Sequence, residues 1–217
     1  LGLQYLARGS LLPPDASVYY QYFQGGEMIS LVALAFDPSG VAANIVAGIF
    51  LPVAAVAGAR AAMEWAREAG RPRPASVRAG AIAGAAIATC PLAILLVAHT
   101  KPDLVALALV ALAARCFSAA SWSPWRAALL LGGALAAKTT TVYVALPLVL
   151  WLTWRLRRRP ARLPLLAILV LLPSSFWIGS NLLHAGRILP QGGHVIDAMM
   201  GLAGVPALER IARLFAA

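Results

Sequence analysis

Residues 41–63 have the sequence VAANIVAGIFLPVAAVAGARAAM, and this stretch decides the class of fold. It matches the roughly 20 mainly apolar residues that an α-helix needs to cross a hydrocarbon core of about 30 Å. A loop rich in proline and arginine follows it, with Arg67, Arg71, Arg73 and Arg78. Because positive charges gather in cytoplasmic loops, we predict a first membrane span here that ends on the cytoplasmic side.

The composition of the whole chain agrees with this stretch. Of the 217 residues, 61% are hydrophobic and only 12% are charged, and the mean hydropathy is +0.79. A water-soluble surface cannot be built from such a composition. The net charge of +10 would suit nucleic acid, but the arginines lie mostly in short loops between apolar segments. Attraction to anionic lipid and control of topology explain them there, so we expect no nucleic-acid partner.

Further apolar segments continue the pattern. Residues 79–98 are predicted to cross outward, and residues 104–120 to return after a short polar loop. Residues 127–154 are too long for one relaxed span and carry KTTT at 138–141, which favours two short helices that meet at an outer tip. Residues 163–179 cross outward again. The predicted fold is all-α, a polytopic transmembrane helix bundle of about six spans, some of them short or paired.

The segments that flank the bundle are expected on the outer face. Residues 1–40 form a loop with an interfacial helix at 20–36, residues 41–179 form the bundle, and residues 180–217 form an outer loop with an amphipathic segment. The first residues resemble no signal peptide and include no initiator Met, so we expect the chain to begin within a longer protein. Cys90 and Cys116 have no partner at a metal-ligand spacing, so both are predicted to be buried, reduced and structural.

Asp103 is the most informative acid because it lies at the tip of a short hairpin, close to His99 and Lys101. A carboxylate in this position can bind a divalent cation such as Mg²⁺ or Mn²⁺, or a lipid-linked phosphate through that cation. The alternative is a helix N-cap for the segment that starts at Leu104. The two roles can coexist.

Lys138 lies between apolar stretches, where an ammonium costs roughly 2.5–3.5 kcal/mol on insertion scales unless it is paired or reaches water. As an unpaired charge it would suit a phosphate or pyrophosphate, and the alternative is a lysine that snorkels at a helix end. Glu27 either binds substrate or only complements a helix dipole.

Soluble-enzyme motifs are missing, and the acidic pair Glu64 and Glu68 is assigned to the basic cytoplasmic loop.

Five short stretches then occur in a common order. LQYLARG (3–9) resembles a "YLxxG" segment, YFQGGEM (22–28) resembles "YPxxxEM", TKPDL (100–104) resembles "TxxDL", GALAAK (133–138) resembles "GxxxTK", and NLLHAGRILP (181–190) resembles "NxxxTGNPxxP". In this order the chain resembles the GT-C class of membrane glycosyltransferases. The resemblance is greatest to bacterial relatives of the dolichyl-phosphate-mannose protein mannosyltransferases and of the lipid A aminoarabinose and galacturonic acid transferases. Phe23, Ala137 and the pair Arg187-Ile188 depart from the family pattern.

The resemblance implies a GT-C-like fold in a bacterial inner membrane. It implies transfer of a sugar from a polyprenyl-phosphate donor to a lipid, glycan or protein acceptor on the non-cytoplasmic face, with inversion at the anomeric carbon. Asp103 would be the catalytic residue and metal ligand. The substrate-binding residues would be Glu27, His99, Lys101, Lys138, Asn181 and Arg187. The family's catalytic base, an acid in the first outer loop, has no counterpart in this chain, so we expect the chain alone to be inactive.

Two other classes of function stay open. A polyprenyl-linked saccharide flippase or secondary transporter also uses broken helices with a polar residue near the midplane, but it would predict a repeat between the halves, and none is apparent. A non-catalytic membrane subunit is the third possibility. It would tolerate replacement of Asp103 and Lys138.

Overall fold

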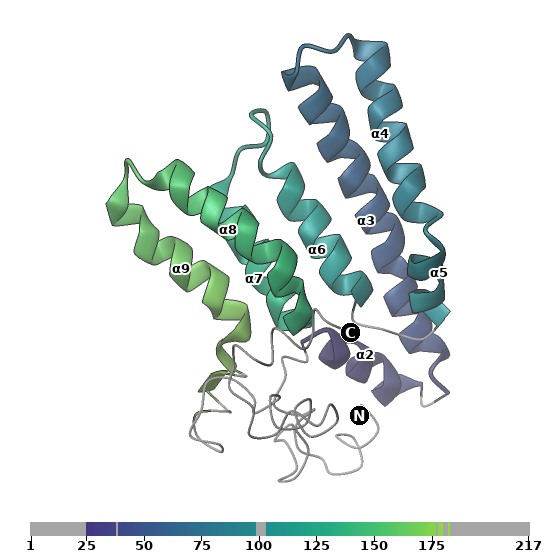
Figure 1. Cartoon of the computed structure of the whole chain (residues 1–217). Coiled ribbons are helices and arrows are strands. Elements are labelled where there is room, and N and C mark those ends of the chain that lie inside the picture. Colours follow the sequence, from purple (N-terminus) through teal and green to yellow (C-terminus); the bar gives the residue numbers. More distant parts are fainter. Residues whose placement is uncertain (1–24, 38, 99–102, 177, 180–181, 183–217) are drawn as a thin grey trace, which may run out of the picture.

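A computed structural model of the chain describes residues 25–37, 39–98, 103–176, 178–179 and 182 (Figure 1). Over these residues the fold is all-α, as predicted, with eight α-helices and no strand. The helices are α2 (Gly25–Phe36), α3 (Val41–Glu68), α4 (Arg73–Ala88), α5 (Pro91–Ala98), α6 (Asp103–Arg115), α7 (Pro124–Ala137), α8 (Val142–Leu156) and α9 (Leu163–Leu171). Three short 3₁₀ turns accompany them: η2 (Thr139–Thr141), η3 (Pro160–Arg162) and η4 (Leu172–Ser174).

One described helix, α3, is long and apolar enough to cross a membrane by itself, and it contains the predicted span at 41–63. Helices α4 and α5 meet the same criterion only as a pair, which is bent by 50° at the break between them. The described residues therefore provide one candidate span, or two if the bent pair counts as one crossing. The predicted number of about six is not shown by these helices.

The long helices lie side by side and alternate in direction (Figure 1). Helix α3 packs against both α4 and α6, α6 packs against α7, and α7 packs against α9. Helix α2 contacts α3, α6 and α7, and it crosses one end of the row (Figure 1). Residues 1–24 and 183–217, which carry most of the predicted outer-face segments, lie outside the described residues.

Small side chains fill the contacts between these helices. Ala54 and Ala57 of α3 lie buried against Ala108 and Ala111 of α6. A Cβ added to Gly80 of α4 would lie 2.8 Å from the carbonyl oxygen of Ala59, so the two backbones are in close contact. Small residues permit this close packing in helices that are surrounded by lipid.

Large aliphatic side chains point outward instead. Val56 is 62% exposed, Ile82 is 70% exposed and Leu150 is 59% exposed. Extensive exposed apolar surface of this kind marks contact with a partner protein or with a membrane. Small residues at helix contacts are common among membrane helices.

The start of α3 is fixed by polar groups in the chain before it. Gly40 takes a left-handed conformation with φ 85°, which glycine adopts at little cost. One carboxylate oxygen of Asp37 accepts hydrogen bonds from the backbone and hydroxyl of Ser39, and the other accepts one from the backbone N–H of Ala42. Asp37 therefore satisfies a free N–H group at the start of the helix.

The prediction that placed Glu64 and Glu68 in the basic loop is wrong. Helix α3 continues to Glu68 and α4 begins at Arg73, so the connection is only residues 69–72. The reason is local: MEWARE (63–68) contains Met, Glu, Ala and Arg, which all favour helix. Pro72 then disfavours helical geometry in the residue before it.

The predicted division of residues 127–154 is confirmed. Helix α7 ends at Ala137, and α8 begins at Val142 after the turn η2. Lys138 separates them with an extended backbone, φ −154° and ψ 120°. The segment is therefore two short helices that meet at a polar break.

Candidate functional site

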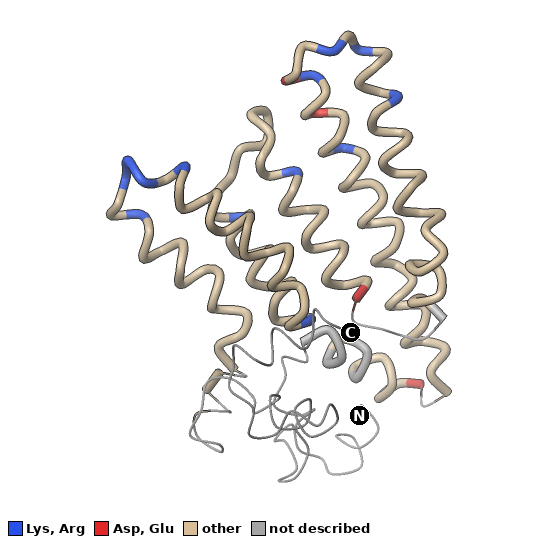
Figure 2. The backbone as a smooth tube through the Cα atoms, viewed as in Figure 1, with Lys and Arg blue, Asp and Glu red and all other residues tan. Residues whose placement is uncertain are grey.

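Charged residues divide the bundle into two ends (Figure 2). The connections α3–α4, α6–α7 and α8–α9 lie at one end, which we call the arginine end. The arginines that the structure describes lie in these connections or in the halves of the helices that adjoin them, with Arg60 the furthest away, eight residues before the end of α3. The opposite end, where α6 begins and α7 meets η2, is called the Asp103 end.

Asp103 and Lys138 form an ion pair at the Asp103 end, although they are 35 residues apart in the chain. Asp103 lies in the first turn of α6, and Lys138 directly follows the last residue of α7. Since α6 and α7 pack against each other, their neighbouring ends bring the two side chains together. The ammonium of Lys138 donates to Oδ1 of Asp103. Lys138 is therefore paired, which is one of the two conditions under which an ammonium near apolar segments is tolerated.

The two side chains of this ion pair are partly buried and partly exposed to solvent. The side chain of Lys138 is 35% exposed and that of Asp103 is 28% exposed. Each charge is partly desolvated, so the loss of either partner would leave the other charge poorly compensated. Asp103 also lies at the positive end of the α6 dipole, where a negative charge interacts favourably.

Thr139 provides a further polar atom at this position. Its hydroxyl oxygen is buried and has no hydrogen-bond partner among the residues that the structure describes. Thr139 is the first residue of η2, immediately after Lys138. A hydroxyl without a partner beside a charged pair can donate to, or accept from, a bound polar ligand.

The described side chains do not by themselves form a metal site. No group of three or more His, Cys, Asp or Glu residues lies together in the part of the chain that the structure describes. Asp103 supplies one carboxylate, and Lys138 already balances its charge. Mg²⁺ is usually held by one or two carboxylates together with waters and substrate phosphates, so this part of the chain would leave most ligands to other groups.

The remaining predicted site residues are only partly placed. His99, Lys101, Asn181 and Arg187 lie outside the described residues. Glu27 lies in the first turn of α2, the helix that crosses the Asp103 end. The fold therefore brings its backbone to the same end of the bundle as Asp103 and Lys138.

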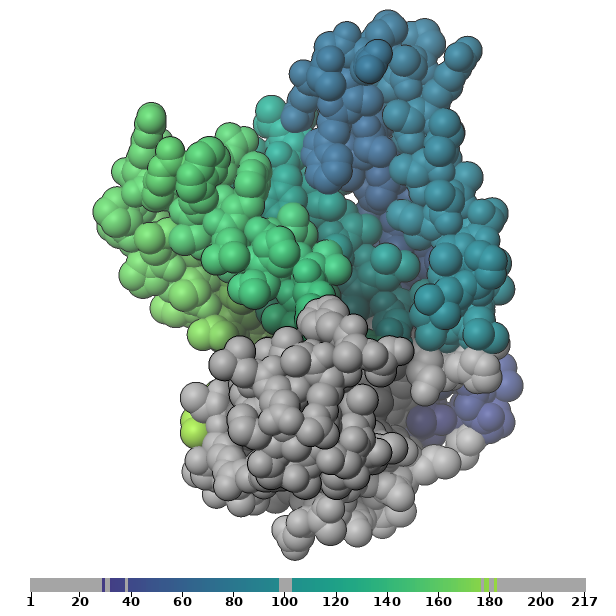
Figure 3. All heavy atoms as spheres, viewed as in Figure 1, coloured from purple at the N-terminus to yellow at the C-terminus, as the bar shows by residue number. Residues whose placement is uncertain are grey.

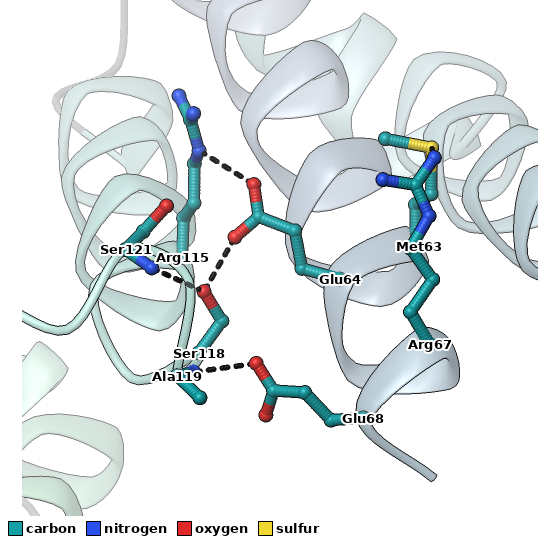
Figure 4. Close-up of polar contacts among 8 residues, drawn as sticks. All are labelled: Met63, Glu64, Arg67, Glu68, Arg115, Ser118, Ala119 and Ser121. Carbon is teal, nitrogen blue, oxygen red and sulfur yellow. Dashed lines mark hydrogen bonds and ion pairs between the residues drawn. The ribbon is translucent and has the colours of Figure 1, made fainter. Parts of the chain in front are cut away.

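A second polar cluster lies at the arginine end (Figure 4). Oε1 of Glu64 accepts a hydrogen bond of 3.2 Å from Nε of Arg115, and Oε2 accepts one from the hydroxyl of Ser118. Glu68, one turn later, accepts from the backbone N–H of Ala119. The two glutamates therefore join the end of α3 to the connection after α6.

This cluster was not expected from the sequence as a contact between segments. The available signal is the spacing of Glu64 and Glu68, because residues four apart share one face of a helix. Ser118 is fully buried and also accepts a hydrogen bond from the backbone N–H of Ser121. These hydrogen bonds connect residues of the cluster to one another, which indicates a structural role.

Comparison of the chain with models of known protein families, with curated proteins and with solved structures finds no match. The resemblance to the GT-C class therefore depends on the short motifs and on where the fold places them.

Proposed function

We propose that the chain is part of a membrane glycosyltransferase of the GT-C type. It would transfer a sugar from a polyprenyl-phosphate donor to a lipid, glycan or protein acceptor on the non-cytoplasmic face. The main support is the ion pair at the Asp103 end. Two separate motif-like stretches, TKPDL and GALAAK, each contribute one partner to it, Asp103 and Lys138. Nothing in the sequence positions of the two stretches requires Asp103 and Lys138 to meet.

We further propose that the bundle is polytopic, with about six spans in a bacterial inner membrane. The exposed aliphatic side chains and the alanine core support a lipid environment. The concentration of arginines at one end supports a cytoplasmic position for that end. The Asp103 end then lies at the opposite face, where polyprenyl-linked sugars would be used.

The chemistry of the pair suits a phosphate leaving group. In the free protein, Asp103 holds the ammonium of Lys138 in position. A phosphate from the donor would compete for that ammonium, and Lys138 would then stabilise the negative charge that develops as the sugar leaves. Thr139 can hydrogen-bond to a phosphate oxygen with its otherwise unpartnered hydroxyl.

The other predicted residues complete the proposal. Asp103 remains the proposed catalytic residue, and Glu27, His99, Lys101, Asn181 and Arg187 the proposed substrate-binding residues. No residue of this chain is proposed as the base that activates the acceptor. No step is assigned to a divalent cation, because the described side chains supply a single carboxylate whose charge is already balanced.

The test is sugar transfer in membranes of cells that express the full-length gene, with a radiolabelled polyprenyl-phosphate sugar as donor. Asp103→Asn should abolish lipid-dependent transfer at matched expression. Asp37→Asn is the control, since it makes the same chemical change at the same end in a residue that only caps α3. Equal transfer by wild type and Asp103→Asn would remove Asp103 from the chemistry.

A saccharide flippase or secondary transporter is the second candidate. The observation that favours it is the presence of two interrupted segments, the 50° bend between α4 and α5 and the break at Lys138. Transporters place substrates at such breaks. Movement of a lipid-linked saccharide across the membrane of proteoliposomes, without transfer of its sugar, would support this function.

If Asp103 and Lys138 can both be replaced without effect on either assay, a non-catalytic subunit is favoured.

A further inference from the structure

A hollow lies at the arginine end, on the side of the bundle formed by α7, α8 and α9. It encloses about 530 Å³, within the range of small-molecule sites. In the space-filling view, the α8–α9 part of the molecule stands apart from the α3–α4 pair (Figure 3). The hollow is lined by residues from the start of α7 and from the connection between α8 and α9: Trp122, Ser123, Pro124, Trp125, Arg155, Leu156, Arg158, Arg159 and Arg162.

The charge of this hollow is strongly positive. Four of its lining residues are arginines, and none of them forms an ion pair with a carboxylate in the described part of the chain. The two described ion pairs lie elsewhere, at Glu64 and at Asp103. Guanidinium groups bind phosphate through paired hydrogen bonds, which makes arginine the preferred residue for such recognition.

Aromatic rings hold one of these arginines in place. The guanidinium carbon of Arg155 lies 5.0 Å from the ring centroid of Trp122 and 4.8 Å from that of Trp151. Both distances fall within the range of a cation–π interaction. The two indoles also contact each other edge-on, with centroids 5.8 Å apart. Arg155 is therefore fixed before any ligand arrives.

The start of α7 adds to the attraction for an anion. Ser123, the residue before the helix, makes no side-chain capping hydrogen bond in the described structure, and Pro124 is the first helical residue. The positive end of the helix dipole is thus directed to the same hollow. Charge, hydrogen-bond donors and dipole all favour a negatively charged ligand.

We propose that this hollow binds the headgroup phosphate of an anionic phospholipid. The apolar surface beside it explains why a lipid is favoured over a soluble phosphate. Trp154 of α8 is 57% exposed and Leu165 of α9 is 47% exposed, next to the arginines in the chain. Acyl chains would cover these side chains while the phosphate occupies the hollow. Basic pockets between membrane helices bind acidic headgroups in this manner.

The proposal is independent of the proposed sugar transfer. The polyprenyl-phosphate donor is assigned to the Asp103 end, and the α8–α9 connection that lines this hollow lies at the opposite end of the bundle (Figure 1). Failure of one proposal would therefore leave the other intact.

The experiment is native mass spectrometry of the protein released from nanodiscs that contain phosphatidylglycerol and phosphatidylcholine in equal amounts. We expect wild type to retain phosphatidylglycerol in preference to phosphatidylcholine. The double variant Arg158→Gln/Arg162→Gln should weaken this retention by at least about tenfold, since the loss of even one charge-assisted hydrogen bond to the phosphate changes affinity on the order of tenfold. Both side chains are exposed, so their replacement leaves the core intact.

The matched control is Arg71→Gln/Arg73→Gln, which removes the same charge from the α3–α4 connection at the same end. It should retain phosphatidylglycerol as wild type does. Equal weakening in both double variants would attribute the effect to general surface charge and overturn the proposal. Displacement of the lipid by millimolar inorganic phosphate would also overturn it, because the ligand would then be a soluble anion. Helix content by circular dichroism verifies the fold of each variant.

Discussion

Gly132 and Gly133 are neighbours on α7 that face different surroundings. A Cβ added to Gly132 would collide with the backbone of α9, where it would lie 2.9 Å from the carbonyl carbon of Val170 and 3.0 Å from the carbonyl oxygen of Leu169. A Cβ added to Gly133 would meet only the end of the Leu109 side chain, at 3.3 Å. We predict that Gly132→Ala destabilises the protein relative to Gly133→Ala.

The size of this effect follows from two contributions. Alanine is favoured over glycine inside a helix by about 1 kcal/mol, and both variants gain this equally. Overpacking against a fixed neighbour costs about 1–3 kcal/mol, and only Gly132→Ala meets backbone that cannot rotate away. The shared gain cancels when the free energies of unfolding of the two variants are subtracted. Gly133→Ala should therefore exceed Gly132→Ala in free energy of unfolding by about 1–3 kcal/mol.

The measurement is reversible unfolding of both variants in the same mixed micelles, followed by circular dichroism. Wild type serves as the reference, and Gly133→Ala should be at least as stable as wild type. If Gly132→Ala equals or exceeds Gly133→Ala in stability, then α9 does not pack on α7 through Gly132, and this part of the fold is refuted.

Three further predictions concern the polar groups. In a double-mutant cycle with Asp103→Ala and Lys138→Ala, unfolding should give a coupling energy of roughly 1–3 kcal/mol, between the values of exposed and buried pairs; additive single effects would contradict the ion pair. The pKa of Asp37 is lowered in the folded protein, mainly by the hydrogen bond from the Ser39 side chain and then by the one from the N–H of Ala42. The stability that the Asp37 carboxylate contributes is therefore complete above its pKa in the unfolded chain, and it is lost as the pH falls through its lower pKa in the folded protein. Asp37→Asn should therefore flatten the decline in melting temperature below about pH 4, and an unchanged decline would assign it to other carboxyls. Ser118→Ala should cost about 1–3 kcal/mol in thermal unfolding because Glu64 loses a buried hydrogen bond, whereas a neutral effect would mean that water replaces the hydroxyl.

Local sequence rules predicted the helices well where composition alone decides the structure. The apolar stretch at 41–63 predicted the core of α3, and the KTTT sequence predicted the break between α7 and α8. A lysine with three threonines is a poor continuation for an apolar helix, because Thr loses rotamer freedom there and an ammonium needs a partner. The end of α3 differs from the prediction, because the helix-forming residues around Arg67 outweigh its positive charge as a sign of a loop.

Contacts between segments were much harder to predict. Sequence patterns marked Asp103 and Lys138 as polar residues of interest, but no pattern states that α6 and α7 meet so that the two form a pair. The same is true of Glu64 and Ser118, which belong to different elements. Periodicity describes one helix at a time, whereas such contacts depend on the distance and rotation between helices.

The alanine-lined interfaces also affect the entropy of folding. An alanine side chain has no rotamers to lose, so burying Ala54 against Ala108 costs no side-chain conformational entropy. A buried leucine or isoleucine would lose about 0.5–1 kcal/mol of such freedom. Bulky residues of this chain, such as Leu150, are exposed, so packing against a neighbouring helix does not fix their rotamers. The helices therefore lose little side-chain conformational entropy when they pack together.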